Sequence, residues 1–367
     1  MTDRSPGRSE LIAQLRQRLD LSEAEIGCLT NGPFEAIETV DAARGGRDIQ
    51  GVDEALAALL PKLSLRYSVQ LKSAAPGATA TLAAQKGPPP GLEGRDDINL
   101  LETVRYERWF IPDQRPRETC IAYAASACIE LLRARQDPDF EPLSAQFLYW
   151  YMRTTAPKSN RPPGWAEGAT RLSYAKAVLE KYGICREAVC RSGLEPDLPL
   201  EGREPSCEAN KEAEKNRITS DTDYLDSREA TQREGIAKRI YDLLSTGRPV
   251  AIALPEFPKN PGSTTTNWNN PTSWGSGIVA DPSPDLVLRE PGNPVGPGHA
   301  VCIVGFQRDH GPAGGWFLFR NSLGGGWAYS IDPTRPHSPH IPAPGYGAIS
   351  ADHIERYCWE MLCPKLP

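Results

Sequence analysis

Apolar residues recur at helical spacing in two separate parts of the chain. Near the start, Leu11, Leu15 and Leu19 share one helical face, and short amphipathic stretches of this kind continue to about residue 63. Each stretch is stopped by Gly or Pro, as helix ends commonly are. We therefore expect residues 1–72 to form a small all-α module in which short helices bury one shared core.

In the second part of the chain, segments with helical spacing come before short strand-like segments. Three apolar segments of helical length come first, and three shorter segments bounded by Gly or Pro and rich in β-branched or aromatic residues come later. The helical segments are 120–133, 171–182 and 236–244, and the strand-like ones are 249–254, 300–306 and 316–320. Helices followed by strands predict an α+β domain with segregated halves.

Three polar stretches divide these elements. Residues 73–97 are rich in Ala, Gly, Thr and Pro and read as an extended linker, so the main domain should cover 98–367. Residues 195–233 are charged and poor in large apolar side chains, which predicts a surface excursion. Residues 258–297 are dense in Asn, Pro, Gly, Ser and Thr next to a strand, a place where long loops often shape a binding cleft.

Composition narrows the classes of partner and compartment. Hydrophobic residues make up 39% and charged residues 24%, with a formal charge of -6, so neither nucleic acid nor an anionic membrane is an expected partner. The sequence has no apolar run long enough to span a membrane and no secretory signal, which predicts a cytoplasmic protein. Its nine cysteines lack metal-like spacing, so we expect most of them to be buried thiols.

Cys120 stands where the first helix of the main domain begins. A helix N-terminus and a nearby imidazolium lower the pKa of a thiol and make it a useful nucleophile. Gln114 lies in the turn-forming segment before it, and its amide could donate to a developing oxyanion together with the Cys120 backbone N–H. These two residues are candidates for a nucleophile and its oxyanion donor.

A base for such a nucleophile must come from a distant segment. Among the five histidines, His299 alone leads directly into an apolar strand, and the next strand ends at Asn321, whose amide oxygen could orient the imidazole. The other histidines lie in polar, Pro-rich or charged stretches, and we expect the first three to be solvated loop residues: His310, His337, His340 and His353.

These residues resemble the motifs of the papain-like (C1) cysteine peptidases, in a bacterial-type form. Gln114 with Cys120 is similar to the family's Q-x5-C segment, the sequence from Gly298 to Val301 to its histidine strand, and the sequence from Asn321 to Gly324 to its N-S-W-G signature. The sequences 143–146 (LSAQ) and 345–347 (GYG) resemble two further family elements. The resemblance implies a two-lobed fold with Cys120 on the helical lobe, His299 and Asn321 on the β-rich lobe, and a cleft for a protein or peptide substrate between them. It also implies a Cys120–His299 ion pair and a thioester acyl-enzyme, in a mechanism that needs neither a metal nor an organic cofactor.

The chain departs from the family pattern at several positions. Arg115 and Glu118 stand where the family usually has glycine, Arg117 replaces a disulfide cysteine, and Leu323 replaces a tryptophan. Trp327 is expected to keep a second aromatic position. Our candidates for the substrate cleft are Glu118, Thr119, Gly168, Ala169, Gly298 and Trp327.

Three functions remain open at this level. The favoured one is an active intracellular cysteine peptidase; a second is an inactive papain-like domain that binds peptides or serves as a scaffold. The third, a transglutaminase-like or amidase relative, is disfavoured because those groups commonly use a carboxylate where Asn321 stands. The helical module is interpreted as either a prosegment or an adaptor for a protein partner, with its compactness and Pro-rich tether favouring the adaptor. Taken singly, each candidate also has a structural reading: Cys120 as a buried thiol, and Asn321 or Gln114 as a turn residue.

Overall fold

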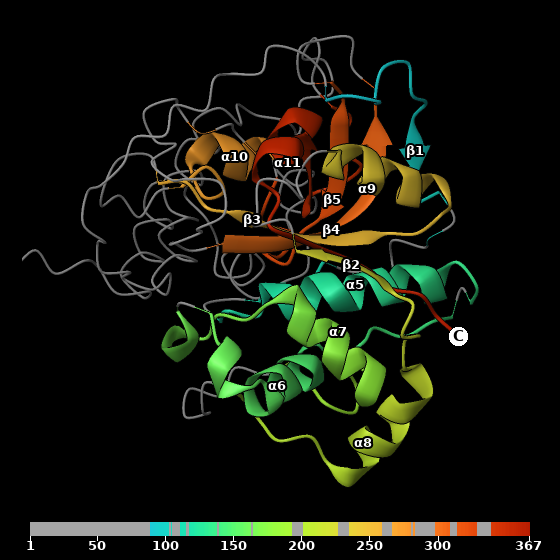
Figure 1. The fold of residues 1–367 in the computed structure, drawn as a ribbon, viewed down its shortest axis with the longest axis vertical. Helices are drawn as coiled ribbons and strands as arrows, with labels where there is room; N and C mark the ends of the chain where they lie inside the picture. The colour runs from blue at the N-terminus through green and yellow to red at the C-terminus, as the bar shows by residue number, and fades with distance from the viewer. Residues whose placement is uncertain are drawn as a thin grey trace, which may run out of the picture.

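Seven strands in the described part of the chain form one antiparallel sheet that packs against a layer of helices (Figure 1). The computed structural model describes residues 89–102, 104, 111–114, 117–137, 139–162, 164–192, 201–226, 235–258, 266–279, 282, 298–308, 314–328 and 339–367. The predicted helical module at 1–72 and most of the predicted linker lie outside the described residues, as does Arg115.

The sheet has the order β2-β7-β3-β4-β5-β6, with β1 paired to β4 beside this path. Its strands are β1 (Ile98–Asn99), β2 (Asp223–Asp226), β3 (Val250–Pro255), β4 (Gly298–Gln307), β5 (Trp316–Arg320), β6 (Tyr346–Ser350) and β7 (Glu360–Cys363). β3 and β4 are almost wholly buried, which explains why both read as continuous apolar runs in the sequence.

The helices divide into two groups. On one side of the sheet α5, α6, α7 and α8 build a helical half, while α9, α10 and α11 accompany the strands (Figure 1). The helices are α5 (Cys120–Ala134), α6 (Ala145–Thr155), α7 (Leu172–Lys181), α8 (Cys207–Ala213), α9 (Ile236–Ser245), α10 (Pro271–Ser276) and α11 (Ala351–Tyr357), with short 3-10 turns η1 (Lys158–Asn160), η2 (Trp165–Glu167) and η3 (Glu214–Asn216). The prediction of an α+β domain with a helical half and a β-rich half is confirmed.

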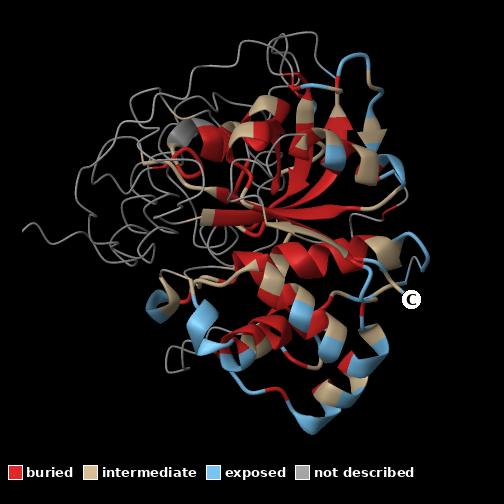
Figure 2. Cartoon of the chain, in the orientation of Figure 1, coloured by how far each residue is buried: buried red, intermediate tan, exposed pale blue. Residues whose placement is uncertain are grey.

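Helix α5 lies at the junction of the two halves. It is buried along most of its length, and Figure 2 shows this buried helix facing the buried strands. Its alanines keep the helix surface small, so the backbone approaches the sheet closely: the sulfur atoms of Cys128 and Cys302, from α5 and β4, are 3.4 Å apart. The helix that begins at Cys120 is therefore held directly against the strand that carries His299.

The described cysteines agree with the expectation of buried thiols. Eight of them are described, all are free, and Cys207 alone among these is exposed. No group of three His, Cys, Asp or Glu side chains that would hold a metal occurs in the part of the chain that the structure describes. None of its helices is both long and apolar enough to cross a membrane.

The segment 195–233 is more than the surface excursion that its composition predicts. It contains α8 and β2, the latter joined to β7 in the sheet. Helix α8 buries only Ala209 and Ala213, and β2 is half-buried along its length. Small or half-exposed contacts of this kind leave little hydrophobic periodicity in a sequence, and for this reason the pattern missed both elements.

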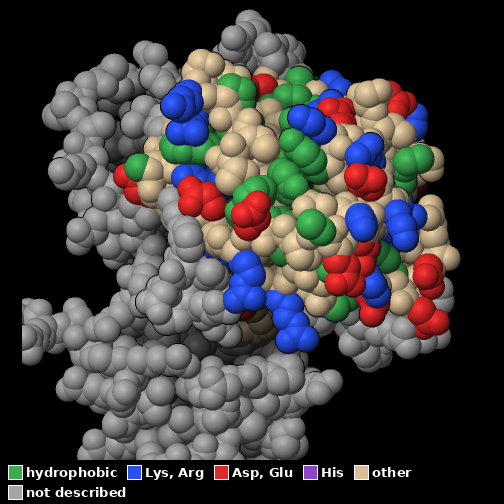
Figure 3. All heavy atoms as spheres, turned by 90° about the horizontal axis from the view of Figure 1, so that it is seen from below, with side chains coloured by type: hydrophobic (Ala, Val, Ile, Leu, Met, Phe, Trp, Pro, Cys, Tyr) green, Lys and Arg blue, Asp and Glu red, His purple; other side chains and the backbone are tan. Residues whose placement is uncertain are grey.

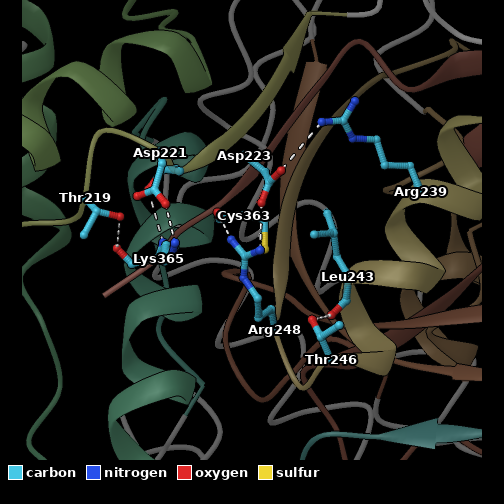
Figure 4. A network of polar contacts seen from close by, with 10 residues as sticks. Thr219, Asp221, Asp223, Arg239, Leu243, Thr246, Arg248, Cys363 and Lys365 are labelled. Atoms are coloured by element: carbon cyan, nitrogen blue, oxygen red, sulfur yellow. Dashed lines mark hydrogen bonds and ion pairs between the residues drawn. The ribbon is translucent and has the colours of Figure 1, made fainter. Parts of the chain in front are cut away.

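A polar network fixes β2 against the rest of the sheet (Figure 4). The Arg248 guanidinium donates to the Asp223 carboxylate at 2.7 Å and to the carbonyl oxygen of Cys363 at 3.0 Å. Arg239 from α9 lies 3.7 Å from the same carboxylate, and Lys365 forms an ion pair with Asp221. These contacts join β2, β7 and α9 at one corner of the molecule.

The face seen from below in Figure 3 carries Lys, Arg, Asp and Glu side chains intermixed, with hydrophobic side chains between them. No single sign of charge dominates the described part of this face. Its charge pattern therefore gives no support for a polyanionic partner there, in line with the formal charge of -6.

Candidate active site

The thiol of Cys120 lies at the start of α5 and is buried, with 6% of the residue exposed. Its sulfur interacts with two backbone N–H groups, one from Ala300 in β4 and one from Ile121. The contact with Ala300 places the sulfur beside the residue that follows His299. The Cys120 thiol thus lies against the strand that carries His299, where α5 and β4 pack together.

His299 is oriented by Asn321. The ring Nε2 of His299 is 2.8 Å from Oδ1 of Asn321, and both residues are buried. Because the amide oxygen can only accept, Nε2 carries the proton and Nδ1 retains a lone pair. Asn321 is held in turn, since its N–H donates to Gly345 and its Oδ1 also accepts from Ser322 N–H. This leaves Nδ1 as the ring nitrogen able to take a proton from a thiol.

An aromatic residue that the sequence did not single out packs on the imidazole. The rings of Trp268 and His299 have centroids 4.8 Å apart at 67°, and Trp268 is 2% exposed. Its Nε1–H donates to the carbonyl of Pro255 at 3.3 Å, which ties it to the end of β3. Trp268 therefore shields the His299–Asn321 hydrogen bond in a protein where Leu323 replaces the expected tryptophan. It comes from the Asn-rich stretch at 258–297, where no periodicity marks it as a site residue.

Gln114 links the segment before Cys120 to the segment after Asn321. Its Nε2 donates to the Arg117 carbonyl at 3.0 Å, and its Oε1 accepts from the Ser322 hydroxyl at 2.6 Å. Its backbone N–H also donates to the carbonyl of Ser322 at 2.7 Å. An amide nitrogen has two hydrogens, so one N–H remains beyond the bond to Arg117. These contacts place Gln114 between the loop before Cys120 and the residue after Asn321.

Burial governs the charge states of the two central groups. It raises the pKa of Cys120 to about 12, and the negative charges of Glu118 and Glu256 act in the same direction, against the two backbone N–H groups. Burial lowers the pKa of His299 to about 4, with the hydrogen bond to Asn321 opposing this shift. Burial therefore favours the neutral form of each group, whereas the family resemblance implies an ion pair between them.

Two of the cleft candidates lie against each other. Gly168 has φ of 116°, and a Cβ at this position would lie 3.0 Å from Cβ of Glu118. The carbonyl of Gly168 accepts from the Tyr149 hydroxyl at 2.9 Å, and that of Ala169 accepts from Arg153 at 3.3 Å. This loop is thus fixed from behind by α6, with Glu118 packed against it.

The remaining cleft candidates differ in their surroundings. Gly298 begins β4, where a Cβ would clash with the Trp359 ring at 2.5 Å. Thr119 is 3% exposed and its hydroxyl is 3.5 Å from the Arg117 carbonyl, so its side chain turns back toward the preceding loop. Trp327 is wrong as a cleft residue: it is fully buried and packs on Phe319 with centroids 5.6 Å apart.

The two other histidines that the structure describes have different surroundings. His340 is exposed, as predicted for a loop residue. His353 is buried in α11 between the rings of Phe257 and Tyr357, at 6.2 and 4.8 Å. His310 and His337 lie outside the described residues.

Comparison with solved structures identifies the fold. The structure of digestive procathepsin L 3 from the larval midgut of Tenebrio molitor matches with a TM-score of 0.50 at 14% sequence identity, over 99% of this chain and 100% of that one. Xylellain, a cysteine protease from Xylella fastidiosa, matches with a TM-score of 0.49 at 17% identity, over 82% of this chain and 100% of that one. No family model matches the sequence, and no curated protein matches it. The chain has the papain-like fold that its motifs predicted.

Proposed function

We propose that this protein is a cysteine peptidase that hydrolyses peptide bonds with Cys120 as nucleophile, His299 as general base and acid, and Asn321 as the residue that orients His299. Gln114 and the Cys120 backbone N–H are proposed to hold the oxyanion. The observation that carries the proposal is the 2.8 Å bond from His299 Nε2 to Asn321 Oδ1, at a place where the Cys120 thiol meets the next residue of β4.

In the proposed reaction, each proton transfer has a defined donor and acceptor. Nδ1 of His299 takes the thiol proton while the sulfur attacks the peptide carbonyl carbon, and the oxyanion is held by N–H donors. The C–N bond then breaks, the leaving amine takes the proton from His299, and a thioester remains. Water attacks the thioester with His299 as base, which releases the carboxylic acid and returns the thiol. The cycle needs neither a metal nor a cofactor.

Covalent labelling tests the proposal directly. A peptidyl epoxide or vinyl sulfone should modify Cys120, detected by mass spectrometry of the intact protein and of its peptides. A Cys120→Ala variant should lose this label and all peptidase activity. A Cys207→Ala variant is the matched control, because Cys207 is the exposed thiol among those described and its loss should leave both signals unchanged. If Cys120 stays unmodified at every pH from 5 to 9, in protein whose fold is confirmed by circular dichroism, the proposed peptidase function is refuted.

A second candidate is an inactive papain-like domain that binds peptides. It is favoured by the raised pKa of Cys120 and by Glu118 standing two residues from the thiol. The two candidates differ in the same experiment: a binding module would retain peptide affinity in the Cys120→Ala variant and would release no cleaved product from the parent protein.

We also propose that residues 1–72 recruit the peptidase to a protein partner and that the protein acts in the cytoplasm. The unbonded sulfur atoms of Cys128 and Cys302, 3.4 Å apart, support a reducing compartment. Deletion of residues 1–72 tests the first point: the activity of residues 73–367 on a short peptide should equal that of the full chain. A gain of activity would show instead that the segment is inhibitory.

A further inference from the structure

Two carboxylates lie close to the Cys120 thiol. Glu118 is two residues before it and packs against Gly168. Glu256 follows the end of β3, where Pro255 pairs with Gly298 beside His299. The charges of both carboxylates act on Cys120, and that of Glu118 acts on Glu256. The pair therefore flanks the sulfur from two elements that are far apart in the sequence.

Other buried carboxylates of the protein are satisfied by specific partners. Glu130 forms an ion pair with Arg320 at 3.0 Å, and Glu355 accepts the N–H groups of Gly235 and Ala237 at the start of α9. Glu360 accepts the Leu172 N–H and the Tyr224 hydroxyl. Each of these groups thus has a structural task that explains its burial.

Glu118 and Glu256 have no comparable set of partners among the described residues. Glu256 accepts a hydrogen bond from Thr266, and no cationic side chain among the described residues acts on either carboxylate. Both residues are half-buried. Burial raises the pKa of Glu118, and burial together with the Glu118 charge raises that of Glu256 to about 7. Two neighbouring carboxylates without a cationic partner in the described part of the chain cost free energy, which a bound cation would recover.

We propose that Glu118 and Glu256 together bind the lysine or arginine side chain of a substrate residue next to the scissile bond. This inference rests on the proposed peptidase function and names its substrate class. A bound cation offsets the two negative charges that disfavour the thiolate of Cys120. The basic residue therefore contributes to the chemical step as well as to binding, so it should raise kcat and lower KM.

Matched peptide substrates test the inference. Fluorogenic peptides carry arginine, or its neutral isostere citrulline, immediately before or immediately after the scissile bond. We expect kcat/KM to be about tenfold or more higher for arginine in one of these positions, as for a charge-assisted hydrogen bond. Glu118→Gln and Glu256→Gln should each reduce this preference severalfold. Glu208→Gln, at an exposed position on α8, is the control and should leave it unchanged.

A second readout separates electrostatics from structural damage. A small neutral thiol reagent should modify Cys120 faster in Glu118→Gln than in the parent protein at pH 7, because a negative charge near the thiolate is gone. Glutamine keeps the size of the side chain, so loss of arginine preference together with faster alkylation is the expected signature. Slower alkylation combined with lost activity would assign Glu118 a packing role and overturn the inference.

The outcomes also distinguish the inference from the proposed function. Suppose that citrulline and arginine peptides are cleaved at equal rates and that the epoxide labels Cys120. This result would overturn the proposed binding of a basic residue by the two carboxylates, and the proposed peptidase function would stand. Failure of Cys120 to react or of any peptide to be cleaved would refute the peptidase itself.

Discussion

His299 is held by contacts from three separate segments. Its own strand β4 fixes the backbone, Asn321 accepts from Nε2, and Trp268 covers the ring. The burial that results lowers the pKa of the imidazole to about 4. The tautomer, the orientation and the proton affinity of the base are therefore set by neighbours rather than by the histidine alone.

Replacing Trp268 by leucine should expose the His299 ring to water. Since burial lowers the pKa of His299, exposure should raise it toward the ordinary value, by about one unit or more. The pKa is measured from the imidazole C–H signals in an NMR titration. Trp268→Phe is the control, because phenylalanine keeps an aromatic ring on His299 and removes only the hydrogen bond to Pro255. An unchanged pKa in the folded leucine variant would contradict the shielding role.

At the scale of elements, a buried ion pair joins helix α5, which begins at Cys120, to strand β5, which ends just before Asn321. Glu130 of α5 and Arg320 of β5 are 3.0 Å apart with side chains 5% and 4% exposed. The other carboxylate oxygen of Glu130 accepts the Leu143 N–H at 2.8 Å. Because Arg320 directly precedes Asn321, this pair fixes the distance between the two halves of the candidate site.

Arg320→Met should lower the free energy of unfolding by about 3–5 kcal/mol, because it leaves the buried Glu130 carboxylate without a cation. A Glu130→Gln/Arg320→Met double variant should recover part of this loss, since no buried charge then remains. Urea denaturation followed by circular dichroism gives the values. The pair Lys176–Glu180, which is more exposed, serves as the control, and Lys176→Met should change the unfolding free energy by less than about 1 kcal/mol.

Elements with a strong apolar pattern were predicted closely from the sequence. Helix α5 and strands β3, β4 and β5 begin and end within two residues of the expected positions. Their burial produces the runs and periods on which such predictions rest. Helix α8 and strand β2 were missed because α8 buries small side chains and β2 is half-exposed.

The sequence predicted only those residues of the candidate site that belong to recognisable motifs. The structure brings Cys120 next to the strand of His299, and bonds His299 to Asn321, as these motifs require. Trp268 and Glu256 went unnoticed because their roles depend on contacts between segments distant in sequence, and no local pattern records such contacts. Trp327 was misplaced for the opposite reason, since an aromatic residue near a motif does not reveal whether it faces the cleft or the core.

At the scale of the whole molecule, Glu256 and His299 make the free energy of unfolding depend on pH in opposite directions. Glu256 has a folded pKa of about 7, above its ordinary 4.5, so the folded state holds a proton that the unfolded state loses between these pH values. Its contribution to stability is therefore present below about pH 4.5 and is lost as the pH rises through 7. His299, with a pKa lowered to about 4, contributes stability above about pH 6.5 that is lost as the pH falls.

Glu256→Gln should accordingly stabilise the protein more at pH 8 than at pH 5, because glutamine removes the cost of a buried charge. The difference between the two pH values should be of the order of 1–3 kcal/mol in the free energy of unfolding. Chemical denaturation at both pH values measures it. Glu208→Gln should show no such difference, and an equal effect of Glu256→Gln at both pH values would contradict the shifted pKa.

The position of β7 in the sheet bears on how the protein is made. β7 is the last strand in chain order, yet it lies between β2 and β3, and β3 is the partner of the strand that carries His299. A nascent chain on the ribosome exposes Cys120 long before residues 360–363 emerge. Until then β2 has no neighbouring strand and the sheet that carries His299 ends at β3. The edge of β3 opposite β4 is thus completed only near the end of synthesis.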